Sequence, residues 1–159
     1  MKNKQPQIFI QTIPDFCIFI NGQLVCFTSS KCRNILAAII GGHGISLSNR
    51  EIIQKVWNKK PDKRLLRSYR VLILRLKKIL EKLKIADIIT TEKINRKIYQ
   101  KANTNRYTCD FIEITKGNLE YISRYKGQYM ESYQWNTSFK TILEYHIDQN
   151  EKLIKKYRS

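Results

Sequence analysis

The stretch RSYRVLILRLKKILEKLK, residues 67–84, decides the fold of this chain. Its apolar residues recur with the period of an α-helix and place one stripe on a single face. The stripe consists of Leu65, Tyr69, Leu72, Leu76, Leu80 and Leu83, with Ile73 and Ile79 on its flanks. The opposite face is basic, yet Val71 and Leu74 lie in its middle. We therefore expect a helix that buries one face in a core and offers the other to a negative partner.

The charge of this segment is concentrated and largely unpaired. Residues 59–84 contain 11 Lys and Arg residues, and their only acids are Asp62 and Glu81. The ion pairs four residues apart that normally stabilise a charged helix face are mostly missing, and a bound polyanion relieves the resulting repulsion. A helix lying on a membrane would put its apolar face into lipid, but the core needs that face here. The pattern favours nucleic acid over a membrane surface.

The distribution of charge along the 159 residues indicates two parts. The net charge is +17, and residues 1–102 carry 21 Lys and Arg against 6 Asp and Glu. Residues 103–150 carry 5 against 6. A charge that served only solubility would be spread evenly along the chain, whereas this one is concentrated in one part. We therefore expect a basic nucleic-acid-binding domain over residues 1–102 and a helical appendage over residues 103–159.

The elements expected before the basic helix start with strands. An apolar run covers residues 8–13, and residues 17–27 form a hairpin around Asn21-Gly22, a pair that suits a tight turn. A helix over residues 31–40 follows three cap candidates, Thr28, Ser29 and Ser30, and ends at the glycine cluster 41–44. Ser48 and Glu51 have the spacing of a capping box that opens a short helix to Trp57, and Asp62 is placed to cap the basic helix.

A second hairpin and a set of helices follow. The β-favouring runs 88–91 and 97–99 flank a charged turn over residues 92–96. Beyond residue 110 we expect helices over 111–116 and 119–126 and a long helix after Trp135. The order predicts an α+β fold: a winged helix-turn-helix with an N-terminal antiparallel β-sheet and a C-terminal hairpin wing, plus an α-helical appendage.

Two segments carry a family resemblance. FTSSKCRNILAAIIGGHGISLSNREIIQKVW (residues 27–57) followed by RSYRVLILRLKKIL (residues 67–80) resembles the OmpR/PhoB-type winged-helix DNA-binding domain. YTCDFIEITKGN (107–118) and YKGQYMESYQWNTSFKTILEY (125–145) resemble the start of the bacterial transcriptional activator domain that follows it in SARP-like regulators, here truncated. The resemblance implies a recognition helix over residues 63–83 in the major groove, whose family contacts fall on Arg67, Arg70, Arg75 and Lys77. The family's glycine-containing wing turn is missing, and only Tyr99 of it is kept.

The function predicted from residues and resemblance together is a sequence-specific, double-stranded DNA-binding transcription regulator in the cytoplasm. Basic side chains would hold phosphates, Val71 and Leu74 would touch thymine methyl groups, and a wing over residues 88–101 would bind the minor groove or the backbone. The predicted DNA-binding residues are Arg64, Arg67, Arg70, Val71, Leu74, Arg75, Lys77, Lys78, Lys93, Arg96 and Lys97. RNA polymerase or another regulator is a further candidate partner.

The C-terminal helix carries an apolar stripe that needs a cover. In residues 136–157 the stripe includes Phe139, Leu143, Ile147 and Ile154, the predicted interaction residues. An isolated helix of this length is marginal in water. We therefore expect a homodimer through residues 136–157.

Other classes of protein are less well supported. The chain has no clustered carboxylates, no nucleotide loop and no C-x-x-C pair, so no catalytic residue, cofactor or metal site is predicted. Its four cysteines are expected to be reduced structural thiols, and no run of apolar residues is long enough to span a membrane. The alternatives that stay open are a winged-helix protein-interaction module that has lost specific DNA binding, and a protein that binds RNA or DNA without sequence preference.

Overall fold

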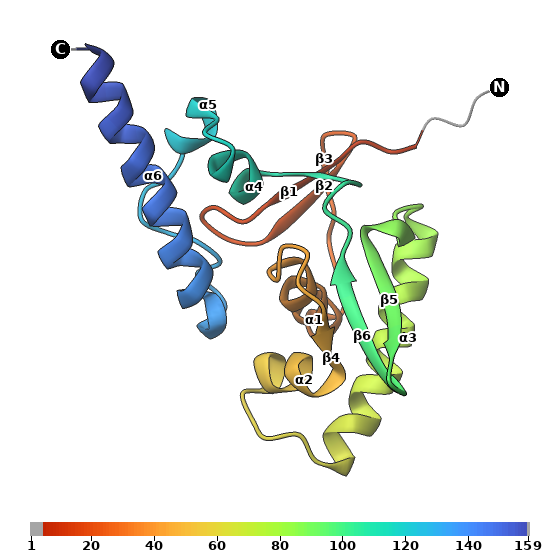
Figure 1. Cartoon of the computed structure of the whole chain (residues 1–159). Helices are drawn as coiled ribbons and strands as arrows, with labels where there is room; N and C mark the ends of the chain where they lie inside the picture. Colours follow the sequence, from red (N-terminus) through yellow and green to blue (C-terminus); the bar gives the residue numbers. More distant parts are fainter. Residues whose placement is uncertain (1–4, 159) are drawn as a thin grey trace. The chain divides into compact units, whose positions relative to one another are not determined.

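The structure, a computed structural model, describes residues 5–158 (Figure 1). It has a mixed α/β fold whose contacts divide the chain into two compact units. Unit 1 is built on Val25–Tyr107, and unit 2 joins Ile8–Leu24 to the segment that starts at Thr108. This division differs from the boundary between residues 102 and 103 that the charge suggested. Residues 8–24 contain a single charged side chain, Asp15, so their charge could not assign them to either part.

The sheet of unit 2 explains why the first strands belong with the C-terminal helices. Strands β1 (Ile8–Gln11), β2 (Cys17–Ile20) and β3 (Gln23–Leu24) are antiparallel neighbours, and β7 (Thr108–Cys109) pairs in parallel with the other edge of β1. The order is β3-β2-β1-β7. The three N-terminal strands are antiparallel, as expected, and the parallel strand β7, which was not predicted, makes the sheet mixed. The Asn21-Gly22 turn is confirmed, with both residues at positive φ.

A buried carboxylate fastens the two chain segments of unit 2 together. Asp110 is the first residue of helix α4 (Asp110–Thr115). Its carboxylate accepts hydrogen bonds from the backbone N–H groups of Thr12 (2.9 Å), Ile13 (3.0 Å) and Phe111 (2.8 Å), and from the Thr12 hydroxyl. Burial raises the pKa of Asp110 above its ordinary value, and the hydrogen bonds, which favour the charged carboxylate, offset only part of this rise.

Helix α5 (Leu119–Ile122) is shorter than expected. The segment after it is irregular up to a 3₁₀ turn, η2 (Gln134–Asn136). Gly127 has a φ of 89°, and Met130 donates its backbone N–H to the carbonyl of Thr12 (2.9 Å) instead of continuing a helix. The prediction of a helix over residues 119–126 was therefore right only for its first turn.

Helix α6 (Thr137–Arg158) packs against α4 within unit 2. Leu143 and Ile147 are buried, and the Phe139 ring meets the Phe111 ring edge-on at 5.7 Å between centroids. Leu143 and Ile147 of the apolar stripe of α6 are thus covered by the chain itself.

Unit 1 contains the helices that the cap residues announced. Helix α1 (Ser30–Ile40) starts after Ser29, whose hydroxyl accepts from the N–H of Cys32 (3.2 Å), and ends at Gly41. Helix α2 (Asn49–Trp57) has the capping box formed by Ser48 and Glu51. Helix α3 (Lys63–Lys82) is capped by Asp62, which accepts from the N–H of Leu65 (2.8 Å). The three predicted starts are confirmed.

The core of unit 1 lies between these helices and a small sheet. On α3 the residues Tyr69, Ile73, Leu76 and Leu80 are buried, as the stripe predicts, with Ile73 deeper than the flank position assigned to it. A 3₁₀ turn, η1 (Ala86–Ile88), leads into the hairpin of β5 (Ile89–Ile94) and β6 (Lys97–Ala102). Strand β4 (Leu47–Ser48), which was not predicted, pairs with β6 and gives the order β4-β6-β5.

Candidate nucleic-acid interface

The outward face of α3 presents nearly all the residues that the sequence assigned to DNA. Val71 and Leu74 are 58% and 61% exposed, unusually high values for apolar side chains in a helix with a buried stripe. Of the eight predicted DNA-binding residues on α3, Lys77 alone is half-buried. The exposed residues of this set are Arg64, Arg67, Arg70, Val71, Leu74, Arg75 and Lys78.

The basic side chains of this face have no acidic partners. Within residues 5–158, the ion pairs of unit 1 join Lys101 to Glu92 and Arg106 to Asp87, and neither involves a predicted DNA-binding residue. Arg67 hydrogen-bonds only within its own helix, from Nε to the carbonyl of Lys63 (3.4 Å). The charge of the α3 face is therefore available to an external anion.

Lys77 has a distinct position at the border between α3 and the hairpin. Its Nζ donates to Oγ1 of Thr91 (2.7 Å), and that hydroxyl donates to Oε1 of Gln100 (2.8 Å), whose side chain is buried. The charge of Lys77 is thus held in place by β5 and β6.

The hairpin turn is tighter than expected. Ile94 pairs with Lys97, so Asn95 and Arg96 alone form the turn, with φ values of 50° and 66°. A two-residue turn with two positive φ angles suits the twist of a β-hairpin, and asparagine tolerates that conformation well. Lys93, Arg96 and Lys97 are all exposed, so this hairpin is basic at its tip without the glycines of the resembling family.

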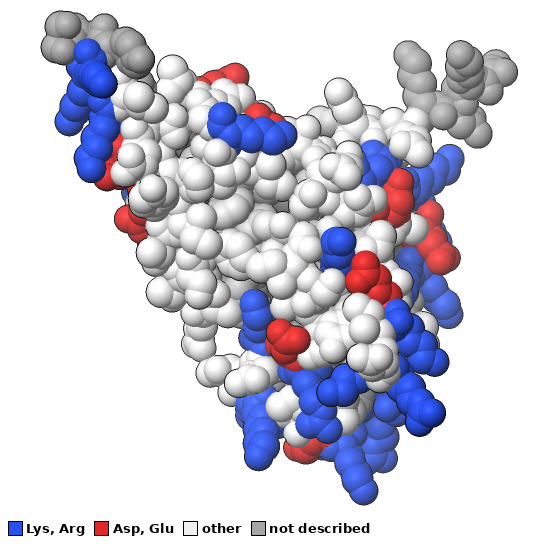
Figure 2. Space-filling model, viewed as in Figure 1, with Lys and Arg blue, Asp and Glu red and all other residues white. Residues whose placement is uncertain are grey.

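The basic residues gather on one part of unit 1. Figure 2 shows Lys and Arg side chains clustered where Figure 1 has α2, α3 and the β5–β6 hairpin. The cluster includes Arg50, an exposed residue in the first turn of α2 that is not among the predicted DNA-binding residues. The Ser48 capping box could have indicated it, because a basic residue in the first turn of a helix is well placed to meet an anion.

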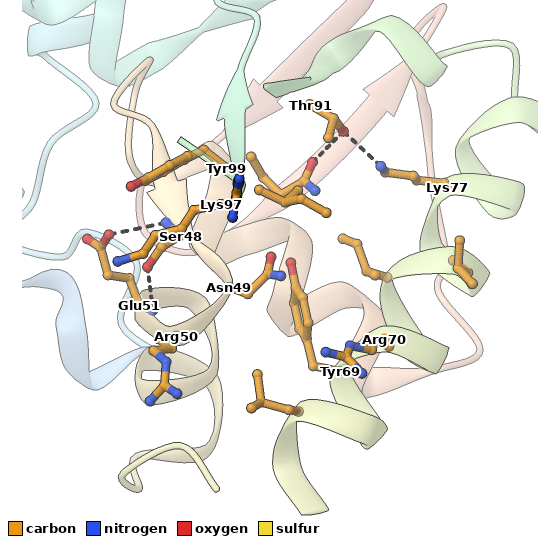
Figure 3. Close-up of a pocket in the computed structure, with 16 residues that line it drawn as sticks. Ser48, Asn49, Arg50, Glu51, Tyr69, Arg70, Lys77, Thr91, Lys97 and Tyr99 are labelled. Carbon is orange, nitrogen blue, oxygen red and sulfur yellow. Dashed lines mark hydrogen bonds between the residues drawn. The ribbon is translucent and has the colours of Figure 1, made fainter. Parts of the chain in front are cut away.

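A pocket lies beside this surface, within unit 1. It has a volume of about 800 Å³ and is lined by the start of α2, by one side of α3 and by the hairpin. Figure 3 shows the side chains of Asn49 and Tyr69 pointing toward one another across it. Tyr69 is 1% exposed, and neither its hydroxyl nor Oδ1 of Asn49 has a hydrogen-bond partner in the described chain.

The predicted interaction residues of α6 lie mostly inside unit 2. Phe139 is half-buried, and Leu143 and Ile147 are buried. The side chain of Ile154 lies outside the described residues. The chain itself covers part of the stripe, while Ile142 and Leu153 stay exposed, and the homodimer stays a prediction.

Residues with metal-binding or acid–base chemistry are scattered. In the part of the chain that the structure describes, no three His, Cys, Asp or Glu side chains gather as a metal site requires. No disulfide joins any of the four cysteines in the described part of the chain. His43 lies in the turn after α1 with a φ of 48°, and burial lowers its pKa to about 3. None of the helices in residues 5–158 combines the length and apolar character needed to cross a bilayer.

Comparison with known proteins supports the fold. No family model and no curated protein matches the sequence. Among solved structures, that of Mycobacterium tuberculosis EmbR in complex with a low-affinity phosphopeptide is similar, with a TM-score of 0.63 at 15% sequence identity. The match covers 92% of this chain and 44% of the EmbR chain, so this chain spans less than half the length of that protein.

Proposed function

We propose that this chain is a sequence-specific, double-stranded DNA-binding transcription regulator of the SARP type. The observation that carries the proposal is the outward face of α3, where basic residues without acidic partners surround Val71 and Leu74. In the free protein, the like charges of this surface repel one another and its apolar side chains are exposed to water. DNA supplies phosphates for the cations and thymine methyl groups for the apolar side chains.

In this proposal unit 1 is a winged helix. The order α1, β4, α2, α3, β5, β6 is the arrangement expected of one, with α3 as the recognition helix and the β5–β6 hairpin as the wing. The helix lies in the major groove, where Arg67 and Lys77 hold phosphates and Leu74 and Arg75 meet base edges. The exposed Lys93, Arg96 and Lys97 of the wing reach the minor groove or the backbone.

The likeness to EmbR, a SARP-family regulator, supports this role at the level of the fold. In the proposal unit 2 corresponds to the beginning of an activator domain and contacts RNA polymerase or another regulator. A cytoplasmic location follows from a role on DNA.

One observation favours a second function. Ile94 and Ile98 of the hairpin are 47% and 44% exposed, close to the basic face that also exposes Val71 and Leu74. Exposed apolar side chains of this number are typical of protein interfaces. A winged-helix module that binds an acidic protein in place of DNA would use the same surface.

Enrichment of duplexes from a random library, followed by fluorescence anisotropy at several salt concentrations, separates these functions. The proposal predicts an enriched motif that is bound at least about a thousandfold more tightly than scrambled DNA, with affinity that falls steeply as salt rises. Equal affinity for all duplexes contradicts sequence-specific recognition. The absence of any binding at low salt favours the interaction module.

A further inference from the structure

The pocket between α2, α3 and the hairpin has the properties of a small-molecule site. Its volume of about 800 Å³ falls in the usual range for ligand pockets, and most of its wall is apolar. Leu66, Ile73 and Leu74 contribute the α3 side, and Ile98 with the Tyr99 ring contributes the hairpin side. Such a wall accommodates an apolar body.

The rim of the same pocket is strongly basic. Five of the lining residues are cations: Arg50, Arg70, Lys77, Arg96 and Lys97. The only acidic lining residue is Glu51, and its Oε1 is occupied by the backbone N–H of Ser48 (3.1 Å) in the capping box. The start of α2 adds the positive end of a helix dipole at this rim. A ligand with an acidic group is therefore favoured over a neutral or cationic one.

Two unsatisfied polar atoms at the back of the pocket specify the ligand further. The Tyr69 hydroxyl is almost completely buried without a partner, and Oδ1 of Asn49 is likewise unpaired. Burial raises the pKa of Tyr69, so the phenol stays protonated and can donate. Buried polar atoms are nearly always paired in native proteins, and an unpaired one often marks a functional site. A ligand O–H group between Tyr69 and Asn49 would satisfy both atoms, because it accepts from the phenol and donates to Oδ1, whereas a ligand N–H group would satisfy Oδ1 of Asn49.

We propose that this pocket binds a small amphipathic organic anion, with an acidic group at the basic rim, an apolar body along α3, and an O–H or N–H group between Tyr69 and Asn49. The residues that the ligand shares with the surface assigned to DNA are Arg70, Leu74, Lys77, Arg96 and Lys97. The ligand is therefore an effector that competes with DNA, and this part of the proposal rests on the proposed function.

The probe for this site is 1-anilinonaphthalene-8-sulfonate, which combines an apolar body, a sulfonate and an N–H donor and fluoresces when bound. We expect the full-length protein to bind it at a single saturable site. Its uncharged analogue N-phenyl-1-naphthylamine lacks only the sulfonate, and we expect it to bind at least about tenfold more weakly because the rim cations lose their partner.

Substitutions locate the probe. Tyr69→Phe removes the hydroxyl and keeps the ring, so it weakens binding roughly three- to tenfold without lowering the thermal melt. Lys97→Ala, on the pocket rim, weakens binding, whereas Lys93→Ala, an equally exposed lysine of the same hairpin outside the lining, leaves it unchanged. Equal binding by wild type, Tyr69→Phe and Lys97→Ala overturns the site, as does binding at many equivalent sites.

Titration of DNA into the protein–probe complex separates this proposal from the proposed function. Displacement of the probe by a bound duplex supports the competition. A duplex that binds without displacing the probe overturns the competition. A protein that binds the probe with these variant effects but binds no duplex supports the pocket and contradicts the DNA-binding role. A protein that binds duplexes but not the probe overturns the pocket alone.

Discussion

Lys77 and Thr91 join the basic helix to the hairpin through a hydrogen bond of 2.7 Å between Nζ and Oγ1. The Thr91 hydroxyl in turn donates a hydrogen bond to Oε1 of Gln100 (2.8 Å), a residue that is 2% exposed. Two successive hydrogen bonds, from Lys77 to Thr91 and from Thr91 to Gln100, thus link α3 to the hairpin; we call this chain the polar relay. It begins at Lys77, a predicted phosphate contact, and ends at Gln100, which is buried in unit 1.

Thr91→Val breaks this relay without changing any charge. The buried Oε1 of Gln100 loses its donor, and an unsatisfied buried acceptor costs about 1–3 kcal/mol, so we expect a lower free energy of unfolding in urea. The salt dependence of DNA binding should stay as in wild type, because Lys77 keeps its charge. Thr91→Ser retains the hydroxyl and serves as the control. Unchanged stability of Thr91→Val would show that the relay does not hold the hairpin.

Single substitutions on α3 should divide into two kinds. Arg67→Ala removes a phosphate contact, so it weakens binding to all duplexes alike and lowers the slope of log affinity against log salt by about 1. Leu74→Ala or Arg75→Ala removes a base contact worth about 1–3 kcal/mol and relaxes sequence preference. Anisotropy with enriched and scrambled duplexes measures both effects. Identical changes for Arg67 and Arg75 variants on both duplexes would refute this division.

The sequence predicted unit 1 more fully than unit 2, for local reasons. Ser48 and Asp62 each form the helix cap expected of them, Ser29 is the one of three candidates that caps α1, and the stripe of α3 is buried as its periodicity required. The parallel pairing of Phe9 with Thr108 was out of reach, because nothing in either segment indicates a neighbour about a hundred residues away. The pocket was equally hidden, since Asn49, Tyr69 and Ile98 are brought together only by the fold.

Asp110→Ala should destabilise unit 2. The backbone N–H groups of Thr12, Ile13 and Phe111 lose their acceptor, which costs on the order of 3 kcal/mol when such groups stay buried. Chemical denaturation followed by circular dichroism measures the loss. As a control, Glu120→Ala removes a carboxylate that pairs only with the exposed Arg124, and we expect a change within about 0.5 kcal/mol.

The pH dependence of stability carries the signature of the same carboxylate. Because the pKa of Asp110 is raised in the folded chain, the unfolded chain releases this proton first, at the ordinary aspartate pKa of 3.8. The contribution of Asp110 to stability therefore falls as pH rises from 3.8 to the folded-state pKa and is constant above it. Asp110→Asn should lack this fall. A variant whose stability follows the same pH profile as wild type would contradict the assignment.

A homodimer through α6 would have to use the apolar residues that the chain leaves exposed. Ile142, Tyr145 and Leu153 are 43%, 61% and 51% exposed, whereas Leu143 and Ile147 are buried within unit 2. We expect twice the chain mass by light scattering at tens of micromolar, and a monomer for Ile142→Glu/Leu153→Glu. Deleting α6 is not a suitable test, because it would expose the core of unit 2. A wild-type monomer with and without DNA would rule out the dimer.

The most direct test of the central claim compares wild type with an Arg67→Ala/Arg70→Ala/Arg75→Ala variant on an enriched duplex in moderate salt. All three side chains are exposed and lack acidic partners within the described residues, so the variant should fold and melt as wild type does. The account predicts that the dissociation constant rises at least about a hundredfold and that the preference over scrambled DNA disappears. Equal affinity of the two proteins for the enriched duplex would contradict the assignment of α3 as the DNA-recognition helix.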